Sequence, residues 1–392
     1  MQKVHTSASP QERAAALISI LDAAAPRIEA ERKMPSDVLA AMHDARIFRV
    51  LLPKSVGGDE ADLVTFAETI ETLAQGDASA AWVSGQGGGC ALSAAFLKPQ
   101  AQKKWFGPKN AVLAWGAGIQ GKAVKVEGGY RVSGRWMFNS GSRHATILGG
   151  HSFVVDNAGA PILRANGSKL DRTVLIRRDQ AKIDDNWHVM GLSGTGSDTF
   201  EIKDLFVAEE DTIDRENLDE LQENASIYLF PGTVVYGVGF SALQLGIARR
   251  MLTELRSLAM TKTPRGVAVS LRENPVFQQL LSRLEARLRS ARAYLMSEAL
   301  SAQQAVSARG AVTIDERARL KLASVHCIHE GVDIVHEAYR AAGSTAIFKS
   351  GPFERRLRDA LSASQQTQAR AENFVNLGRI LLDLDPGNTA FL

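Results

Sequence analysis

Hydrophobic residues in the first hundred positions recur at intervals of three or four, which is the period of a helix with one buried face. The sequence Ser9-Pro10-Gln11-Glu12 has the spacing of a capping box, with proline at the first helical position, so a helix is predicted to start there. A second helix is predicted from about Pro35, and Gly57-Gly58 interrupts the pattern before helices resume at about Asp62. A glycine cluster at 85–89 divides this last stretch, and we expect there either a flexible kink or open space beside a bound ring.

In the middle of the chain the pattern changes to alternation, which is typical of half-buried strands. The clearest segment is VEGGYRVSGRWMFNSGSRHA at 126–145, where Gly128-Gly129 predicts the turn of a β-hairpin because glycine takes positive φ at low cost. The large residues that alternate along this segment are Tyr130, Val132, Trp136 and Phe138. Further short segments of this kind follow, so we expect an all-β insert of about a hundred residues that forms a small barrel or a sandwich.

The helical period returns at about Tyr228 and continues to the end of the chain. Asn274-Pro275 has the form of a helix cap. The apolar residues that follow it at helical spacing are Phe277, Leu280, Leu284, Leu288, Ala291 and Leu295. Two more helices are predicted from about 315 to 339 and from about 352 to 382, which makes this part a bundle of antiparallel helices.

The predicted fold class is therefore mainly α with a central β domain. Its three parts are an N-terminal helical domain at 1–110, a central β domain at 111–225 and a C-terminal helical bundle at 226–392.

Composition and charge narrow the classes of function. The chain has 392 residues and a formal net charge of +3, with its lysines and arginines spread along the sequence, so a nucleic-acid-binding surface is not indicated. Cys90 and Cys327 are the two cysteines, which fits a reducing compartment without disulfides. The N-terminus lacks the apolar core of a signal peptide, and no apolar run of about 18 residues occurs, so no membrane span is expected and the expected location is the cytoplasm.

Two glycine-rich segments are candidates for ligand-facing loops. Residues 116–121 match G-x-G-x-x-G, but a strand pattern follows where a nucleotide fingerprint requires a helix, so a loop that lets the backbone approach a ligand is the better interpretation. Residues 187–198, WHVMGLSGTGSD, carry the hydroxyls of Ser193, Thr195 and Ser197 on a glycine-rich backbone. This loop suits either phosphate binding through its N–H groups or a tight turn between strands.

The end of the hairpin carries residues that suit a flat, amphipathic cofactor. The indole of Trp136 can cover a ring face, while Asn139, Ser140 and the loop N–H groups meet its polar edge.

Two polar groups in the helical part have plainer interpretations. His326, His329, Glu330 and His336 share one predicted helix, but convergent ligands are not evident, so a polar helix face is favoured over a metal site. The segment with Lys262 and Arg265 joins two long helices and is most simply a charged loop, although in an oligomer it can reach a neighbour's phosphate.

The order of a helical domain, a β domain and a helical bundle resembles the acyl-CoA dehydrogenase superfamily over nearly the whole chain. Three segments carry the resemblance: YRVSGRWMFNSGSRHA, MGLSGTGSDTFEIKDLFV and GPFERRLRDA. The resemblance implies a homotetramer that binds flavin between the β domain and the bundle.

Two branches of this superfamily imply different chemistry. The dehydrogenases place a catalytic glutamate after the RDA segment, and by spacing that position falls at or near Thr367. No carboxylate occurs from Ala360 to Ala371, and a neutral side chain cannot abstract a proton, so ordinary acyl-CoA dehydrogenation is disfavoured. A dehydrogenase-type FAD oxidoreductase with a displaced base and a relative without flavin remain as alternatives.

The chain more closely resembles the two-component (group D) flavin-dependent monooxygenases, through SGSRHA, GLSGTGSD and AMTKTPRGVAVSL. This resemblance implies an oxygenase component that takes reduced flavin, FADH2 or FMNH2, from a separate NAD(P)H-flavin reductase. With molecular oxygen it forms a flavin C4a-hydroperoxide and hydroxylates an aromatic or heteroaromatic small molecule, indole-like or phenolic, as in aromatic compound catabolism. The two histidines usual in this branch would fall at Gln366 and near Cys90, where this chain has none.

The resemblance also implies roles for individual residues. The candidates for managing the oxygen chemistry are Ser142, His144 and Gln366. The candidates for holding the flavin are Trp115, Trp136, Asn139, Ser140, Thr195, Ser197, Lys262 and Arg265. Among these, Asn139 and Ser142 are expected at the flavin edge, and Thr195 and Ser197 at its phosphate or ribityl hydroxyls.

Overall fold

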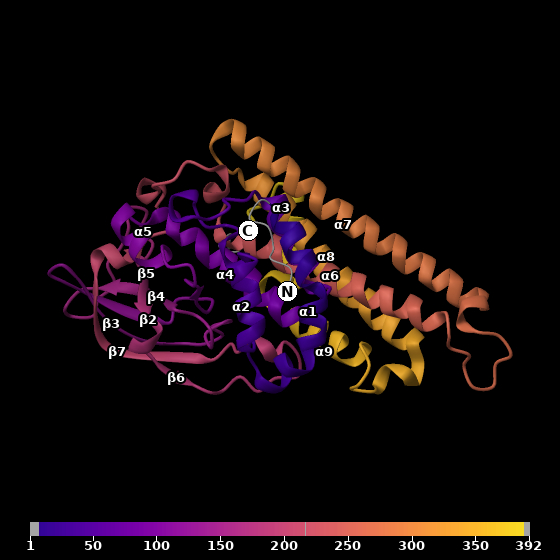
Figure 1. The fold of residues 1–392 in the computed structure, drawn as a ribbon. Coiled ribbons are helices and arrows are strands. Elements are labelled where there is room, and N and C mark those ends of the chain that lie inside the picture. Colours follow the sequence, from indigo (N-terminus) through magenta and orange to yellow (C-terminus); the bar gives the residue numbers. More distant parts are fainter. Residues whose placement is uncertain (1–7, 216, 388–392) are drawn as a thin grey trace.

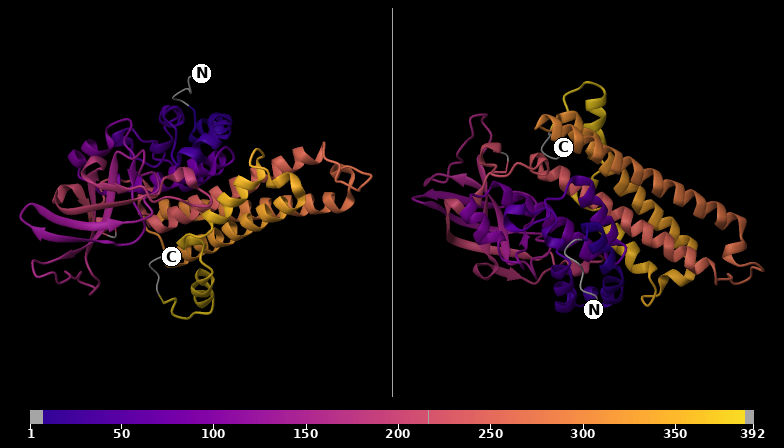
Figure 2. Two further views of the ribbon diagram at one scale, coloured as in Figure 1. Left: turned by 90° about the horizontal axis from the view of Figure 1, so that it is seen from below. Right: turned by 45° about the horizontal axis from the view of Figure 1, so that its top comes forward.

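The computed structural model describes residues 8–215 and 217–387. A helical N-terminal part and a sheet lie together at one side of the molecule, and long helices extend from them to the other side (Figure 1). Both views in Figure 2 show the long helices running away from the strands. Mainly helical architecture with a central β domain is confirmed.

Five α-helices form the N-terminal part: α1 (Pro10–Glu31), α2 (Ser36–Asp44), α3 (Leu63–Ala74), α4 (Ala78–Ala91) and α5 (Pro99–Phe106). The capping box at the start of α1 is confirmed, because the Ser9 hydroxyl accepts the Glu12 N–H and the Glu12 carboxylate accepts the Ser9 N–H. A 3-10 turn, η1 (Ile47–Arg49), follows α2.

The glycine cluster at 85–89 lies inside α4 and does not interrupt it, so the expected kink is wrong. The rings of Phe66 and Tyr236 occupy the space that side chains at Gly88 and Gly89 would need. Close helix packing explains these two glycines, and the stabilisation it provides outweighs the low helix propensity of glycine.

The β domain is one sheet with strand order β6-β7-β3-β2-β4-β5-β8, and β1 pairs with β4. Its strands are β1 (Leu113–Ala114), β2 (Gly121–Val126), β3 (Gly129–Trp136), β4 (Ile147–Val155), β5 (Asp171–Arg177), β6 (Lys182–Asp184), β7 (Thr199–Ala208) and β8 (Thr212–Ile213). The predicted hairpin is β2–β3, with Gly128 at φ +74° in its turn. A strand therefore follows the G-x-G-x-x-G segment, as the sequence indicates.

The C-terminal helices are α6 (Gly232–Ala259), α7 (Pro275–Arg309), α8 (Ile314–Ala342), α9 (Phe353–Ala363) and α10 (Glu372–Leu381). Asn274 caps α7, and the predicted seam from Phe277 to Leu295 is buried except for the partly buried Leu280. The single last helix expected from 352 to 382 is wrong. The chain breaks after Ala363 and forms the turn η11 (Thr367–Ala369), because the Gln366 side chain accepts the Gln368 N–H and competes with helical hydrogen bonding.

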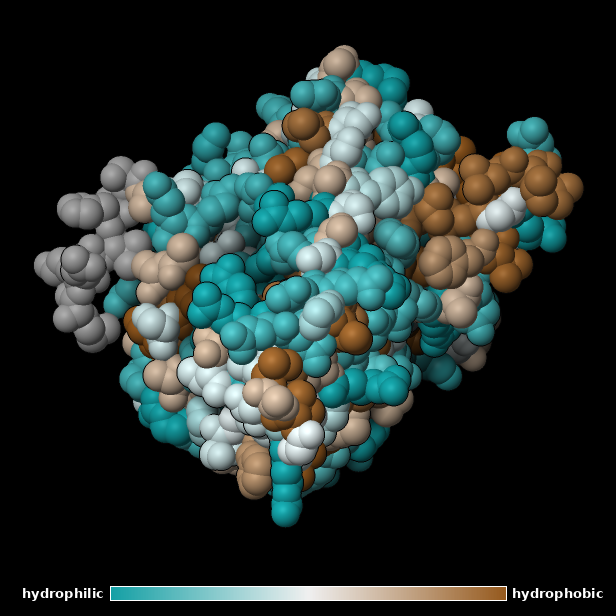
Figure 3. All heavy atoms as spheres, turned by 90° about the vertical axis from the view of Figure 1, so that its right-hand side faces the viewer, coloured by the Kyte–Doolittle hydropathy of each residue, from teal (hydrophilic) through white to brown (hydrophobic). Residues whose placement is uncertain are grey.

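The α6–α7 loop lies at the end of the bundle that is farthest from the sheet (Figure 1). Figure 3 looks onto this end and shows hydrophobic side chains among hydrophilic ones. The exposed hydrophobic residues of this loop and of the segment after α8 are Met260, Val267, Val269, Ile347 and Phe348.

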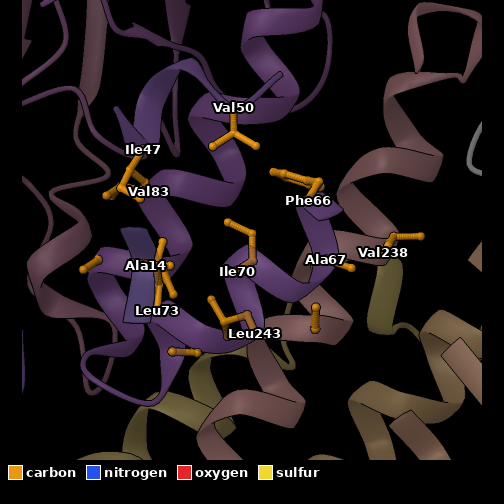
Figure 4. Close-up of a cluster of buried hydrophobic side chains, with 14 of the residues drawn as sticks. Ala14, Ile47, Val50, Phe66, Ala67, Ile70, Leu73, Val83, Val238 and Leu243 are labelled. Carbon is orange, nitrogen blue, oxygen red and sulfur yellow. The ribbon is translucent and has the colours of Figure 1, made fainter. Parts of the chain in front are cut away.

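One hydrophobic core joins the N-terminal helices to the bundle. In Figure 4, Phe66, Ile70 and Leu73 of α3 lie in one buried cluster with Val238 and Leu243 of α6. This packing fixes α6 beside α3 and α4, while a smaller core fills the β domain. Within the described residues, no helix is long and apolar enough to cross a membrane.

Candidate functional site

Two loops predicted to face a ligand are joined to each other beside the sheet. The Gly141 N–H donates to the Thr195 carbonyl at 2.8 Å, and the Asn139 N–H donates to the Asp198 carbonyl at 3.2 Å. The Ser142 hydroxyl donates to the Gly196 carbonyl at 2.8 Å. Residues 139–144 and 193–198 therefore form one rigid unit, which we call the double loop.

A chain of hydrogen bonds with a fixed direction runs through the double loop. The Trp82 indole N–H donates to Ser140 Oγ at 2.9 Å, Ser140 Oγ lies 2.8 Å from Ser197 Oγ, and Ser197 Oγ lies 2.8 Å from Thr195 Oγ1. Thr195 donates its proton to the Leu192 carbonyl at 2.8 Å, so it must accept from Ser197, and Ser197 must accept from Ser140. Each hydroxyl has thus given away its proton and can only accept a further hydrogen bond.

This direction favours one of the two expected roles of Thr195 and Ser197. A phosphate group accepts hydrogen bonds and offers almost none, so hydroxyls whose protons are already committed do not suit it. Acceptance of hydrogen bonds from ribityl hydroxyls or from ring N–H groups is the role that this geometry allows.

Trp136 does not lie where a cofactor ring can stack on it. Its side chain is fully buried in the β-domain core, stacked on Phe200 with ring centroids 4.8 Å apart, and its indole N–H donates to the His151 carbonyl at 2.9 Å. The expected cover for a flavin ring is therefore wrong in this structure. Trp136 instead anchors the end of β3, from which the double loop starts.

Phe138, two residues after Trp136, is exposed instead. It has φ of 62°, unusual for a residue with a side chain, and is 62% exposed. Its ring meets Trp187 edge to face at a centroid separation of 6.0 Å. Positive φ turns this residue out of the strand alternation, so the periodicity that placed Phe138 in the strand was wrong at this position.

Trp115 is buried beside the same loops, with the Arg215 guanidinium 5.1 Å from its ring centroid. The following residue, Gly116, packs against the Met137 carbonyl so closely that a Cβ has no room. The glycine thus brings the 115–118 segment against the end of the hairpin, where the sequence predicted a close backbone approach.

Three of the predicted site residues have buried polar atoms with no partner. Among the described residues, seven buried side-chain nitrogen or oxygen atoms lack a hydrogen bond, and Asn139 Oδ1, His144 Nε2 and Gln366 Nε2 are among them. Buried polar groups are nearly always paired in folded proteins. An unpaired buried atom is open to a hydrogen bond from a ligand. Asn139 and His144 share the double loop, whereas Gln366 lies between α9 and η11.

His144 is a neutral imidazole at neutral pH. Burial, together with the nearby His43 and Arg178, lowers the pKa of His144 to about 4. Its ring lies 5.6 Å from the Phe48 ring between centroids, so it faces η1 of the N-terminal part. In this state His144 can donate and accept hydrogen bonds without carrying charge.

The partly exposed side chains of α4 and α6 meet next to the double loop, at a place that we call the α4–α6 contact. Every residue of α4 is buried except Trp82 and Gln86, and Tyr236 on the facing side of α6 is also half-buried. Trp82 stacks on Phe240 at 4.1 Å with an interplanar angle of 12°, and Tyr236 stacks on Phe240 at 5.8 Å and 14°. We call these three nearly parallel rings the aromatic ladder.

Sequence reasoning missed the ladder and Gln86. Trp82 and Gln86 are four residues apart, as are Tyr236 and Phe240, so each pair shares one helix face. Nothing in the sequence shows that the two faces meet, because α4 and α6 are far apart along the chain.

Lys262 and Arg265 are not brought to the double loop. Lys262 Nζ donates to the Ala342 carbonyl at 2.5 Å and to Thr345 Oγ1 at 2.8 Å, which closes the end of α8. Arg265 is exposed on the α6–α7 loop. Within one chain, the α6–α7 segment that carries these residues lies at the far end of the bundle from the sheet (Figure 1).

Two of the polar residues noted on α8 pair with neighbouring elements. His329 Nε2 lies 2.7 Å from the Ala369 carbonyl, and Glu330 accepts from Arg287. Within the described part of the chain, no group of three or more His, Cys, Asp or Glu residues is placed to hold a metal ion.

Comparison with known proteins matches both helical parts to one family. The family model described as acyl-CoA dehydrogenase, C-terminal domain, matches residues 238–370, and the model for the N-terminal domain matches residues 15–111. The indole-3-acetate monooxygenase of Pseudomonas putida is 30% identical over 358 residues, covering 91% of this chain and 89% of that protein. The oxygenase subunit HsaA of a flavin-dependent monooxygenase from Rhodococcus jostii (strain RHA1) is 25% identical over 360 residues, covering 89% and 91%.

A solved structure has the same fold. The crystal structure of 3-HSA hydroxylase from Rhodococcus sp. RHA1 superposes with a TM-score of 0.89 at 25% identity, covering 99% of this chain and 100% of that one.

Proposed function

Because the chain belongs to the acyl-CoA dehydrogenase superfamily, in its branch of flavin-dependent monooxygenases, we propose that it hydroxylates an aromatic or heteroaromatic small molecule, indole-like or phenolic. The relatives named indole-3-acetate monooxygenase and resorcinol hydroxylase, oxygenase component, support both ring types. The protein is the oxygenase component, and a separate NAD(P)H-flavin reductase supplies its reduced flavin.

The observation that carries this proposal is the acceptor character of the double loop. Asn139 Oδ1 is an unpaired buried acceptor, and the Ser140, Ser142 and Ser197 hydroxyls have donated their protons elsewhere. Such a lining suits a ligand rich in N–H and O–H donors. Reduced flavin has more ring N–H groups than oxidised flavin, so these residues fit the reduced form.

When bound, reduced flavin supplies the electrons with which oxygen is activated for transfer to the substrate ring. Asn139 and Ser142 accept hydrogen bonds from the flavin ring edge, and Ser140, Thr195 and Ser197 accept from its ring or ribityl donors. Gln366 Nε2 and His144 provide neutral hydrogen-bonding groups for substrate or oxygen. The aromatic ladder keeps water away from this place, which protects reduced flavin from wasteful oxidation.

The arrangement offers little support for dehydrogenation. No carboxylate follows Asp359 up to Ala371, and Asp359 itself accepts the Leu192 N–H at 2.7 Å from a buried position. An electron-rich ring needs no strong base to be hydroxylated, so a site of neutral groups suits the proposed reaction.

Binding of the flavin phosphate is best explained by an assembly of several chains. Lys262 and Arg265 lie at the end of the bundle where hydrophobic residues such as Phe348 are exposed. In the proposed homotetramer this end meets a neighbouring chain, and its cations reach the neighbour's flavin phosphate. The two buried free thiols fit the proposed location in the cytoplasm.

Equilibrium binding of flavin in both redox states tests the proposal. Reduced FMN and FAD should each bind at least about tenfold more tightly than the oxidised forms, because several acceptors lose their partners in the oxidised ring. Tightly bound oxidised FAD that an acyl-CoA bleaches without oxygen would show the dehydrogenase alternative. Failure of both redox forms to bind would show a relative without flavin.

A further inference from the structure

Three polar side chains form a hydrogen-bonded row at the α4–α6 contact. Gln86 Nε2 lies 3.1 Å from the Trp115 carbonyl and 3.7 Å from Cys90 Sγ. Cys90 Sγ lies 3.4 Å from Tyr236 Oη. The row thus links α4 to the β domain on one side and to α6 on the other.

The orientation of the Gln86 amide follows from these contacts. A main-chain carbonyl can only accept, so the group that faces Trp115 O must be the NH₂ of Gln86. If the amide were turned over, two carbonyl oxygens would face each other. The Gln86 carbonyl oxygen therefore points away from Trp115, and it accepts no hydrogen bond from any residue that the structure describes.

The Gln86 oxygen belongs to the accessible side of α4. Gln86 and Trp82 are the two residues of α4 that are not buried, and Trp82 belongs to the aromatic ladder. A flat ring that binds at the α4–α6 contact thus meets the ladder and one oriented acceptor. A ring that carries a hydrogen-bond donor binds better there, since a ring without one covers the acceptor and leaves it unpaired, which costs free energy.

We propose that Gln86 selects substrates with a ring N–H or O–H by accepting a hydrogen bond from that group, with Cys90 and Tyr236 as positioning residues that hold the row in place. This inference rests on the proposed function and names the specificity element of the same site. Cys90 and Tyr236 are neutral: burial raises the pKa of Cys90 to about 12 and that of Tyr236 well above its usual value. The bound substrate therefore keeps its proton.

A pair of isosteric ligands tests the inference directly. Indole has a ring N–H, and benzofuran has an oxygen at the same place. The ratio of their dissociation constants therefore measures how much the N–H donor contributes to binding. Binding is measured by calorimetry or fluorescence quenching on the full-length protein with flavin present. For the wild type we expect indole to bind about tenfold more tightly than benzofuran.

The variant Gln86→Leu should bring the ratio close to one, chiefly by weakening indole. Cys90→Ala should reduce the ratio partially, because Gln86 loses one of its two restraints. The matched controls are Cys327→Ala, whose thiol faces the Ala291 carbonyl inside the bundle, and Tyr228→Phe, whose hydroxyl faces the Leu51 carbonyl. Both controls should keep the wild-type ratio.

Equal binding of the two ligands by the wild type would overturn the inference without any variant. An unchanged ratio in Gln86→Leu would overturn it as well. If that variant does not fold, the ratios measured for the wild type and for Cys90→Ala test the inference. Failure of the proposed function would look different, because flavin would then not bind, or would bind more tightly in its oxidised form, whatever the ratio of the ligands.

Discussion

The indole N–H of Trp82 donates to the hydroxyl of Ser140 at 2.9 Å, which ties α4 to the double loop. Trp82→Phe keeps an aromatic ring beside Phe240 but removes this donor and leaves the directed chain of hydroxyls without its first member. We expect more hydrogen peroxide and less hydroxylated product per reduced flavin, by about tenfold. Trp105→Phe is the control. Trp105 lies on the distant helix α5, and its indole N–H donates to Asp211 at 2.7 Å. Equal product yields in the two variants would contradict the role of Trp82.

Ser142→Ala tests the acceptor at the flavin edge. The Ser142 hydroxyl is fully buried and donates to the Gly196 carbonyl, so alanine removes both the acceptor and one link inside the double loop. Binding of reduced flavin should weaken by about tenfold, and reoxidation should release more hydrogen peroxide. The measurement is a stopped-flow trace of reoxidation together with a peroxide assay. Unchanged coupling would mean that the oxygen chemistry lies elsewhere.

The burial of His144 predicts that the protein loses stability in mild acid. Its pKa falls from 6.5 to about 4 on folding, so between these values the unfolded chain binds more protons than the folded one. The free energy of unfolding should therefore fall as pH decreases from about 6.5 to 4. His144→Gln should show a shallower fall of Tm over this window, although His151, whose burial lowers its pKa to about 3, still contributes. Identical pH profiles for wild type and variant would contradict the burial of this ring.

The burial of Asp359 predicts the opposite dependence of stability on pH. Burial, with the nearby Asp77, raises its pKa from 3.8 to about 7, so the folded chain binds more protons between these values and loses stability as pH rises through them. Asp359→Asn keeps an oxygen for the Leu192 N–H but carries no charge. The variant should gain stability over the wild type as pH rises from 5 to 8, by about 3 kcal/mol. Chemical denaturation at several pH values measures this gain, and the exposed Asp37→Asn on α2 should show none.

Local signals in the sequence predicted the elements whose causes are local. The capping box at Ser9 and the cap at Asn274 predicted the starts of α1 and α7, because caps act within one turn. The glycines of α4 were misread because their reason is the packing of Phe66 and Tyr236, which are distant in sequence. The break at Gln366 was missed because a side chain that bonds its own backbone leaves no change of period.

The candidate site was likewise predicted only where a local motif marks its residues. Asn139, His144 and Gln366 were selected from motifs, and the structure gives each a buried atom without a partner. Trp136 was misplaced because the face of a strand that turns inward depends on its sheet neighbours, here Phe200. Gln86 and Tyr236 carry no motif, and only the pairing of two helices brings them to one place.

The central claim is that this protein transfers an oxygen atom from molecular oxygen to an aromatic ring with reduced flavin. The most direct measurement is a single turnover with reduced flavin, isotopically labelled dioxygen and a small set of indoles and phenols, with product mass as the readout. The account predicts a hydroxylated product that carries one labelled oxygen atom. Reoxidation of bound flavin without labelled product from any of these rings, or bleaching of oxidised flavin by an acyl-CoA instead, would contradict it.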